Sequence, residues 1–119
     1  MTYLLDTNTC IFMMKQTPSV VEQFRYAQNK GIAISSITLA ELEFGVSNSK
    51  AYERNRNALF AFSTLVEILL FDVLASAEYG RVRAALKKVG TPIGALDTLI
   101  AAHAKSLNLT LVTNNIREF

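Results

Sequence analysis

The sequence predicts an α/β fold, a three-layer α/β/α domain built on a parallel sheet. Short apolar runs typical of buried strands alternate along the chain with longer segments whose apolar residues recur at helical spacing. Several of the helical segments end in stop signals, such as the sequences Asn29-Lys30-Gly31 and Val89-Gly90. Strands that are separated by helices pair in parallel, and their helices cover both faces of the sheet.

The predicted elements follow one another without a linker or a repeat. We expect strands at 3–5, 32–38, 66–71 and 109–112. We expect helices at 9–15, 19–29, 39–47, 51–65, 72–88 and 94–106. The segment 66–71 is apolar almost throughout, which is typical of a strand buried on both faces.

Length and composition indicate one domain with a single core. The chain has 119 residues, half of them hydrophobic, which is enough for one core and too few for two. The apolar stretch 65–71 is too short to span a bilayer and contains Glu67. The start of the chain lacks the pattern of an export signal, and the single cysteine, Cys10, cannot form an internal disulfide. We therefore expect a protein of the cytoplasm without membrane association.

Three carboxylates stand at junctions between apolar segments. Asp6 ends the first predicted strand, Glu41 follows the second, and Asp97 lies near the start of the last long helix. Because the active sites of parallel sheets lie at the carboxyl ends of the strands, the fold is expected to bring these acids together. Three such acids at one edge would bind a hard divalent cation.

Charge is compatible with a polyanionic ligand but does not require one. The chain has 12 basic and 10 acidic residues, a net charge of +2. If three acids bind a metal, the remaining surface is basic, which suits a ligand that carries phosphates. A net charge of +2 is equally ordinary for a soluble protein.

Each acid also has a structural interpretation. Asp6 and Asp97 could cap helices. Glu41 could be an acid of the first helical turn that interacts favourably with the helix dipole. Glu43 lies about 200° around a helix from Glu41 and should face solvent. His103 is the only histidine, which excludes a ribonuclease that uses two histidines as acid and base, and packing or surface placement is expected for it.

Four sequence blocks, in order along the whole chain, resemble the PIN-domain ribonucleases of the VapC toxin family. The blocks are 5–8 (LDTN), 35–45 (SSITLAELEFG), 93–104 (IGALDTLIAAHA) and 109–115 (LTLVTNN). The resemblance implies a PIN-like fold over residues 1–119. It implies that Asp6, Glu41 and Asp97 are catalytic residues that bind Mg²⁺ or Mn²⁺, directly or through water. It assigns positions that orient those ligands or contact substrate phosphate to Thr7, Asn8, Thr113 and Asn115.

The resemblance also implies a substrate and partners. Such a toxin cuts RNA, here expected to be initiator transfer RNA in the anticodon region, and is neutralised by a VapB-type antitoxin. Apolar patches at 12–14 and around Phe60 and Phe62 are expected to serve a homodimer and a docked antitoxin segment. Arg54 and Arg56, with Tyr52, could contact RNA or form a solvated helix face.

Two features depart from the family pattern. Asn115 stands where the family often has a fourth acid, and Glu118 could supply the missing charge. The sequence is therefore compatible with either one or two bound metal ions. The chain ends at Phe119, and we expect it to lack a short C-terminal tail that the family usually has.

The sequence fits other classes of protein less well than it fits a nuclease. A non-catalytic module that binds RNA or a partner is the alternative that Asn115 suggests. A phosphorelay receiver needs an acidic pair after the first strand and a lysine after the last, and neither is present. A dinucleotide-binding domain needs a glycine-rich turn after the first strand, where the chain has Asp6-Thr7-Asn8.

Overall fold

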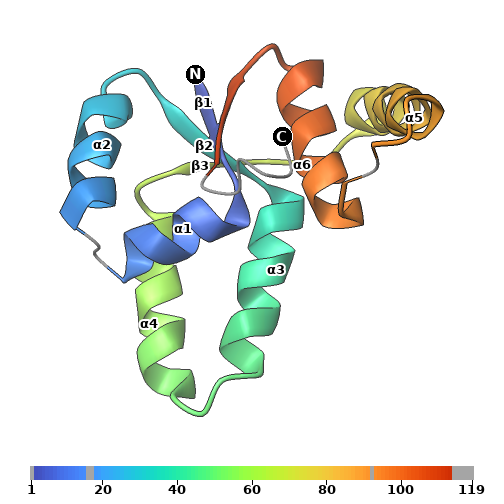
Figure 1. Ribbon diagram of the computed structural model, residues 1–119. Coiled ribbons are helices and arrows are strands. Elements are labelled where there is room, and N and C mark those ends of the chain that lie inside the picture. Colours follow the sequence, from blue (N-terminus) through green and yellow to red (C-terminus); the bar gives the residue numbers. More distant parts are fainter. Residues whose placement is uncertain (1, 16–17, 92, 114–119) are drawn as a thin grey trace.

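A parallel sheet lies at the centre of the molecule, with helices around it (Figure 1). The computed structural model describes residues 2–15, 18–91 and 93–113. In chain order the elements are β1 (Tyr3–Leu5), α1 (Thr7–Met14), α2 (Pro18–Gln28), β2 (Ile32–Ser35), α3 (Ser36–Ser47), α4 (Tyr52–Ser63), β3 (Glu67–Leu69), α5 (Val73–Lys88), α6 (Ala95–Ser106) and β4 (Thr110–Val112).

The sheet confirms the predicted fold class. Its strand order is β3-β2-β1-β4, and every neighbouring pair is parallel. Leu5, the last residue of β1, pairs with Ile34 on one side and with Val112 on the other. The carboxyl ends of β1, β2 and β4 therefore meet at one edge, where Asp6 and Thr113 follow their strands.

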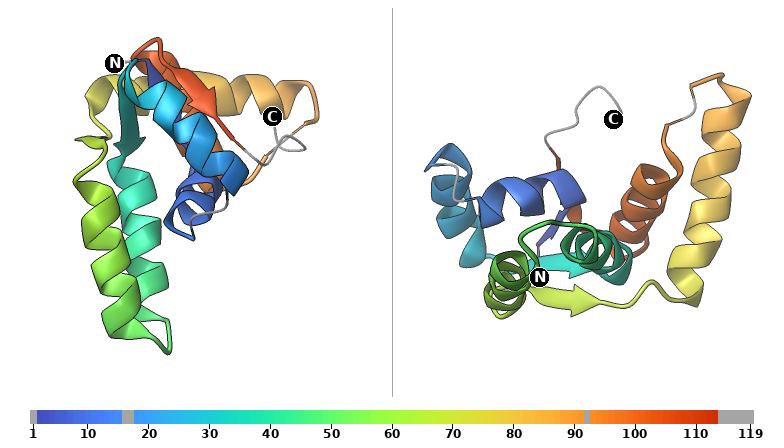
Figure 2. Two further views of the ribbon diagram at one scale, coloured as in Figure 1. Left: turned by 90° about the vertical axis from the view of Figure 1, so that its left-hand side faces the viewer. Right: turned by 90° about the horizontal axis from the view of Figure 1, so that it is seen from below.

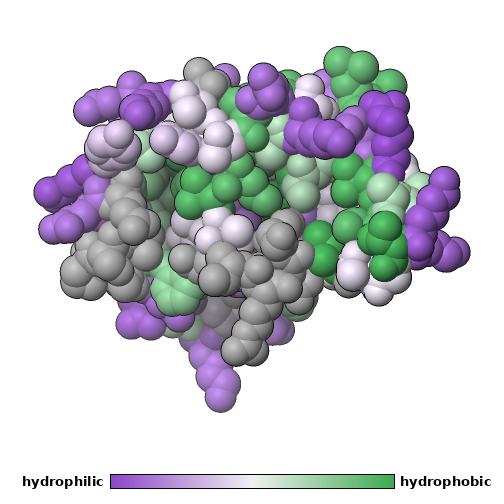
Figure 3. Space-filling view, turned by 45° about the horizontal axis from the view of Figure 1, so that its top comes forward, coloured by the Kyte–Doolittle hydropathy of each residue, from purple (hydrophilic) through white to green (hydrophobic). Residues whose placement is uncertain are grey.

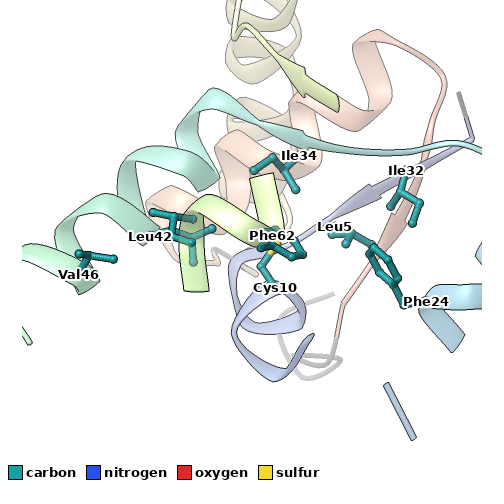
Figure 4. Packing of buried hydrophobic residues seen from close by; sticks show 9 residues of the cluster. Leu5, Cys10, Phe24, Ile32, Ile34, Leu42, Val46 and Phe62 are labelled. Atoms are coloured by element: carbon teal, nitrogen blue, oxygen red, sulfur yellow. The ribbon is translucent and has the colours of Figure 1, made fainter. Parts of the chain in front are cut away.

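Alternate residues of the central strands enter two separate cores, which makes the domain three-layered. Leu5 and the flanking β2 residues Ile32 and Ile34 pack with side chains from α1, α2, α3 and α4 (Figure 4). Leu4 and Ala33 point the other way and pack with α6. Helix α5 lies beyond α6 at the margin of the molecule, as the views of Figure 2 show.

Two predicted strands were wrong in part. The segment expected at 66–71 forms only Glu67–Leu69, and its Glu67 and Ile68 are exposed, because β3 is an edge strand rather than a central one. The strand expected at 32–38 ends at Ser35, because the Ser35 side chain accepts a hydrogen bond from the Ile37 amide and starts α3 three residues early. Glu41 thus lies in the second turn of α3, not in its first.

The apolar patches expected on the surface are divided between surface and core. Phe12 and Phe60 are exposed, whereas Phe62 is buried in the core that contains Leu5. Met13 and Met14 are partly buried and pack against that same core. Apolar residues form green areas between hydrophilic groups on the face shown in Figure 3. Among the described residues, no helix has both the length and the apolar composition needed to cross a membrane.

His103 connects three elements from inside the protein. It is 1% exposed, its Nδ1 lies 2.8 Å from the Ser35 hydroxyl, and its ring meets that of Phe71 edge-on at 5.3 Å. Of the two placements expected for His103, packing and surface, the structure shows packing. Burial lowers the pKa of His103, although the charge of Asp72 and the Leu70 backbone oppose that shift.

The buried imidazole predicts a loss of stability in mild acid. Below the ordinary pKa of about 6.5 the unfolded chain takes up a proton that the folded chain excludes, so the free energy of unfolding should fall as the pH drops from 7.5 to 5.5. Urea unfolding across this range measures the slope. His103→Gln should flatten it, and an equal slope in the variant would contradict the assignment to His103.

Candidate active site

Asp6 joins three elements at the carboxyl edge of the sheet. It is the N-cap of α1, and its Oδ1 accepts a hydrogen bond of 2.8 Å from the Thr9 amide. The Thr113 hydroxyl, directly after β4, donates to its Oδ2. Asp6 is 2% exposed, and within the described parts of the chain no ion pair joins it to a lysine or arginine. This carboxylate is held in place by neutral donors.

Glu41 is tied to the residue after Asp6. The Thr7 hydroxyl, at the start of α1, donates a hydrogen bond of 2.6 Å to Glu41 Oε1 on α3. The two residues are 34 positions apart in the sequence. This bond fixes the Glu41 carboxylate relative to the N-terminus of α1.

Asp97 lies across a cleft from these residues. It belongs to the first turn of α6, which begins after Gly94. A cleft of about 870 Å³ is lined by Thr7 and Asn8 of α1, Glu41 of α3 and Asp97 of α6. Its other described lining residues are apolar or glycine, and they contribute neither lysine nor arginine: Ile11, Ile37, Ala40, Phe44, Gly94, Ala95 and Leu96.

The oxygen groups of the cleft fit a hard cation that keeps much of its own hydration. Across residues 2–15, 18–91 and 93–113, no three Asp, Glu, His or Cys side chains are grouped so as to hold a metal ion by themselves. Mg²⁺ is often held by only one or two carboxylates together with water and substrate phosphate. Glu41 and Asp97 can supply such carboxylates. Asp6, the neighbour of Thr7 in the chain, is buried and is not among the described lining residues of the cleft.

Other predicted residues are placed as follows. Glu43 is partly exposed to solvent, as expected, and it also forms an ion pair of 2.7 Å with Arg56. The hydrogen bond from Arg56 lowers the pKa of Glu43. Arg56 also lies over the Tyr52 ring, 5.5 Å from its centroid. Asn115 and Glu118 lie outside the described residues.

Two buried hydroxyls near the site were missed by sequence reasoning. Ser35 both caps α3 and contacts His103 of α6, so it connects the helices that carry Glu41 and Asp97. Thr38 is fully buried, and its hydroxyl finds no hydrogen-bond partner within the described structure. The only sequence signal for either was a Ser-Ser-Ile-Thr run, which was assigned to a strand.

Comparison with known proteins identifies the class of this α/β domain. The PIN domain family matches residues 3–119. The chain is 44% identical to tRNA(fMet)-specific endonuclease VapC of Salmonella typhimurium over 117 residues, which cover 98% of this chain and 89% of the relative. It is 46% identical to Ribonuclease VapC2 of Rickettsia felis over 121 residues, covering 100% and 90% of the two chains.

A solved structure agrees with these relatives. The crystal structure of VapBC2 from Rickettsia felis bound to a DNA fragment from their promoter superposes with a TM-score of 0.95 at 44% identity. The match covers 100% of this chain and 91% of that one. The chain belongs to the VapC ribonucleases of the PIN domain family. The resemblance seen in the sequence is confirmed, and the names of the relatives do not favour a non-catalytic module.

The bond between Thr7 and Glu41 can be tested by removing one hydroxyl. Thr7→Val keeps the shape of the side chain but leaves the Glu41 carboxylate without its donor, so unfolding in urea should lose about 1 kcal/mol. If Glu41 binds a divalent ion, the affinity for Mn²⁺, measured by calorimetry, should fall about tenfold, because groups that orient metal ligands contribute that much. Thr7→Ser retains the hydroxyl and should bind Mn²⁺ like the unmodified protein. Undiminished Mn²⁺ affinity in Thr7→Val would contradict a role for the Thr7 hydroxyl in orienting the Glu41 carboxylate.

Proposed function

We propose that the chain is a metal-dependent endoribonuclease, the toxin of a toxin–antitoxin pair. The observation that carries the proposal is the acidic cleft, in which Glu41 and Asp97 meet Thr7 and Asn8 without a basic side chain among the described lining residues. Such a cleft repels an RNA phosphate unless a cation is present to offset the charge. Membership of the VapC ribonucleases supports the same reaction.

The proposed metal residues are Asp6, Glu41 and Asp97, with Mg²⁺ or Mn²⁺ as the ion. When bound, the ion would lower the pKa of water and offset the charge that develops on the phosphate. Glu41 and Asp97 would hold the ion at the cleft, and Asp6 would contribute directly or through water. Thr7 orients Glu41, and Thr113 orients Asp6.

The remaining polar residues are assigned to the substrate. Asn8 lines the cleft beside Thr7, and its side-chain amide is proposed to donate to a phosphate oxygen. Asn115 is proposed to have a similar role. The amides at the start of α6, close to Asp97, add a partial positive charge that favours a phosphate at the cleft.

Initiator transfer RNA, cut in the anticodon region, is the proposed substrate. A relative with 44% identity is named a tRNA(fMet)-specific endonuclease, and that similarity extends over 98% of this chain. A VapB-type antitoxin is the proposed partner, since a similar solved structure is a VapBC complex. The exposed Phe12 and Phe60 are proposed to contact a second copy of the chain or the antitoxin. We place the reaction in the cytoplasm, where its substrate is found.

Cleavage of purified initiator transfer RNA tests the proposal. With Mg²⁺ or Mn²⁺ the protein should give discrete products, and EDTA should abolish them. Asp97→Asn and Glu41→Gln should each lower the rate at least a hundredfold, because each removes a negative charge at the metal position while keeping the side-chain shape.

A matched control separates these effects from unfolding. Glu43→Gln changes the same kind of side chain two residues from Glu41, outside the cleft, and should cleave within about twofold of the unmodified protein. Cleavage that persists in EDTA, or in folded Asp97→Asn, would contradict a metal-dependent mechanism. Elongator transfer RNA left intact beside initiator transfer RNA would support the proposed substrate.

A further inference from the structure

A second groove adjoins the acidic cleft. It has a volume of about 370 Å³ and lies between α5 and the first turn of α6. Its described lining residues are Tyr79, Arg83, Leu86 and Lys87 of α5, Ile93 ahead of α6, and Ala95 and Thr98 of α6. Figure 2 shows the two helices side by side at one margin of the molecule.

Three of the four α5 side chains that line the groove form one stripe along that helix. Tyr79, Arg83 and Lys87 are spaced four residues apart, a spacing that places side chains on the same face of a helix. Arg83 Nη1 donates a hydrogen bond of 3.0 Å to the Tyr79 hydroxyl, and its guanidinium carbon lies 6.0 Å from the ring centroid. An aromatic ring and two cations are therefore presented together to the groove.

The stripe lies in a segment with a strong excess of positive charge. Between Glu78 and Asp97 the sequence has four basic residues and no acid. Arg81 is paired with Glu78 at 2.8 Å, on another side of α5. Arg83 and Lys87 are exposed, and no ion pair within the described structure involves either of them. Their charge is available to a ligand.

The basic groove and the acidic cleft share a wall. Ala95 lines both of them, and Asp97 follows it in the same helical turn. A strand of nucleic acid whose phosphate is held at Glu41 and Asp97 would pass over Ala95 to reach Arg83 and Lys87. Ala95 has only a methyl side chain, which leaves this passage open.

We propose that Tyr79, Arg83 and Lys87 bind the single-stranded RNA next to the phosphate that is cut. Arg83 and Lys87 contact phosphates, and the Tyr79 ring stacks on a base. Basic grooves with aromatic platforms bind single strands in this way, with little dependence on base sequence. The inference rests on the proposed ribonuclease function. It adds to that function an RNA-binding track, formed by Tyr79, Arg83 and Lys87, along which the substrate lies.

Binding of initiator transfer RNA to the Asp97→Asn protein tests the track without cleavage. The fluorescently labelled RNA is titrated at several salt concentrations. The double variant Arg83→Gln, Lys87→Gln should raise Kd at least tenfold, because two phosphate contacts are lost. The slope of log Kd against log salt concentration should also fall, by about one to two counterions released on binding. Tyr79→Leu should raise Kd about fivefold or more, whereas Tyr79→Phe keeps the stacking ring and should stay within about twofold.

Lys88 provides a control of equal charge. It is the neighbour of Lys87, it is exposed, and it does not line the groove. Lys88→Gln should therefore change Kd by less than about twofold, while Lys87→Gln alone raises it severalfold. Equal effects of the two substitutions, or no effect of either, would overturn the proposal. All variants are checked for folding by urea unfolding and for oligomeric state by gel filtration, and a change of oligomeric state in the double variant would also overturn it.

Cleavage by the otherwise unmodified chain separates this inference from the proposed function. The double variant should show a raised KM with kcat within about threefold, because it loses binding away from the reacting phosphate. If the chain cuts no RNA but the variants still lose RNA affinity, the nuclease function fails and the track stands. If the variants bind and cut RNA like the parent protein, the track fails and the nuclease function stands.

Discussion

The site depends on one buried carboxylate, Asp6, at the carboxyl edge of the sheet. It caps α1 through the Thr9 amide and accepts a hydrogen bond from Thr113 after β4, so it fixes a strand end, a helix start and a second strand end at one point. Burying a carboxylate is costly unless its charge is offset. The hydrogen bonds from two neutral donors offset part of the desolvation free energy of the carboxylate, and a cation in the cleft would offset more of it.

The acids beyond Asp6 are held by helices that are joined to each other. Thr7 connects α1 to Glu41, and the contact between Ser35 and His103 connects α3 to α6, which carries Asp97. Like charges placed close together repel, and repulsion alone would separate these helices. The hydroxyl and imidazole contacts oppose that separation, so the packing of the core maintains a cleft suited to a divalent ion. The positive charge needed for RNA stands outside this cleft, on α5, where it does not neutralise the acids.

Local signals in the sequence were sufficient for the fold class, and they singled out Asp6, Glu41 and Asp97, of which Glu41 and Asp97 line the cleft. Thr7 and Asn8 were implied only by the resemblance to the VapC family. Asp6 and Asp97 were found because a single acid beside an apolar segment is conspicuous, and the parallel topology placed them at one edge. The exposure of β3 was not predictable from its apolar run, because it depends on the order of strands in the sheet. The start of α3 was misplaced because Ser35-Ser36-Ile37-Thr38 suits a strand and a helix cap equally well. The bond between Thr7 and Glu41 and the groove between α5 and α6 arise only from tertiary packing.

The proposed function requires that the acidic cleft hold a divalent cation. Crystals soaked in Mn²⁺ and measured at the manganese absorption edge locate the ion directly through its anomalous scattering. We expect one or two peaks in the cleft, within coordination or water-bridged distance of the Glu41 and Asp97 carboxylates. An anomalous map without a peak in the cleft at millimolar Mn²⁺, or with a peak only at other surface acids, would show that the cleft is not a cation site.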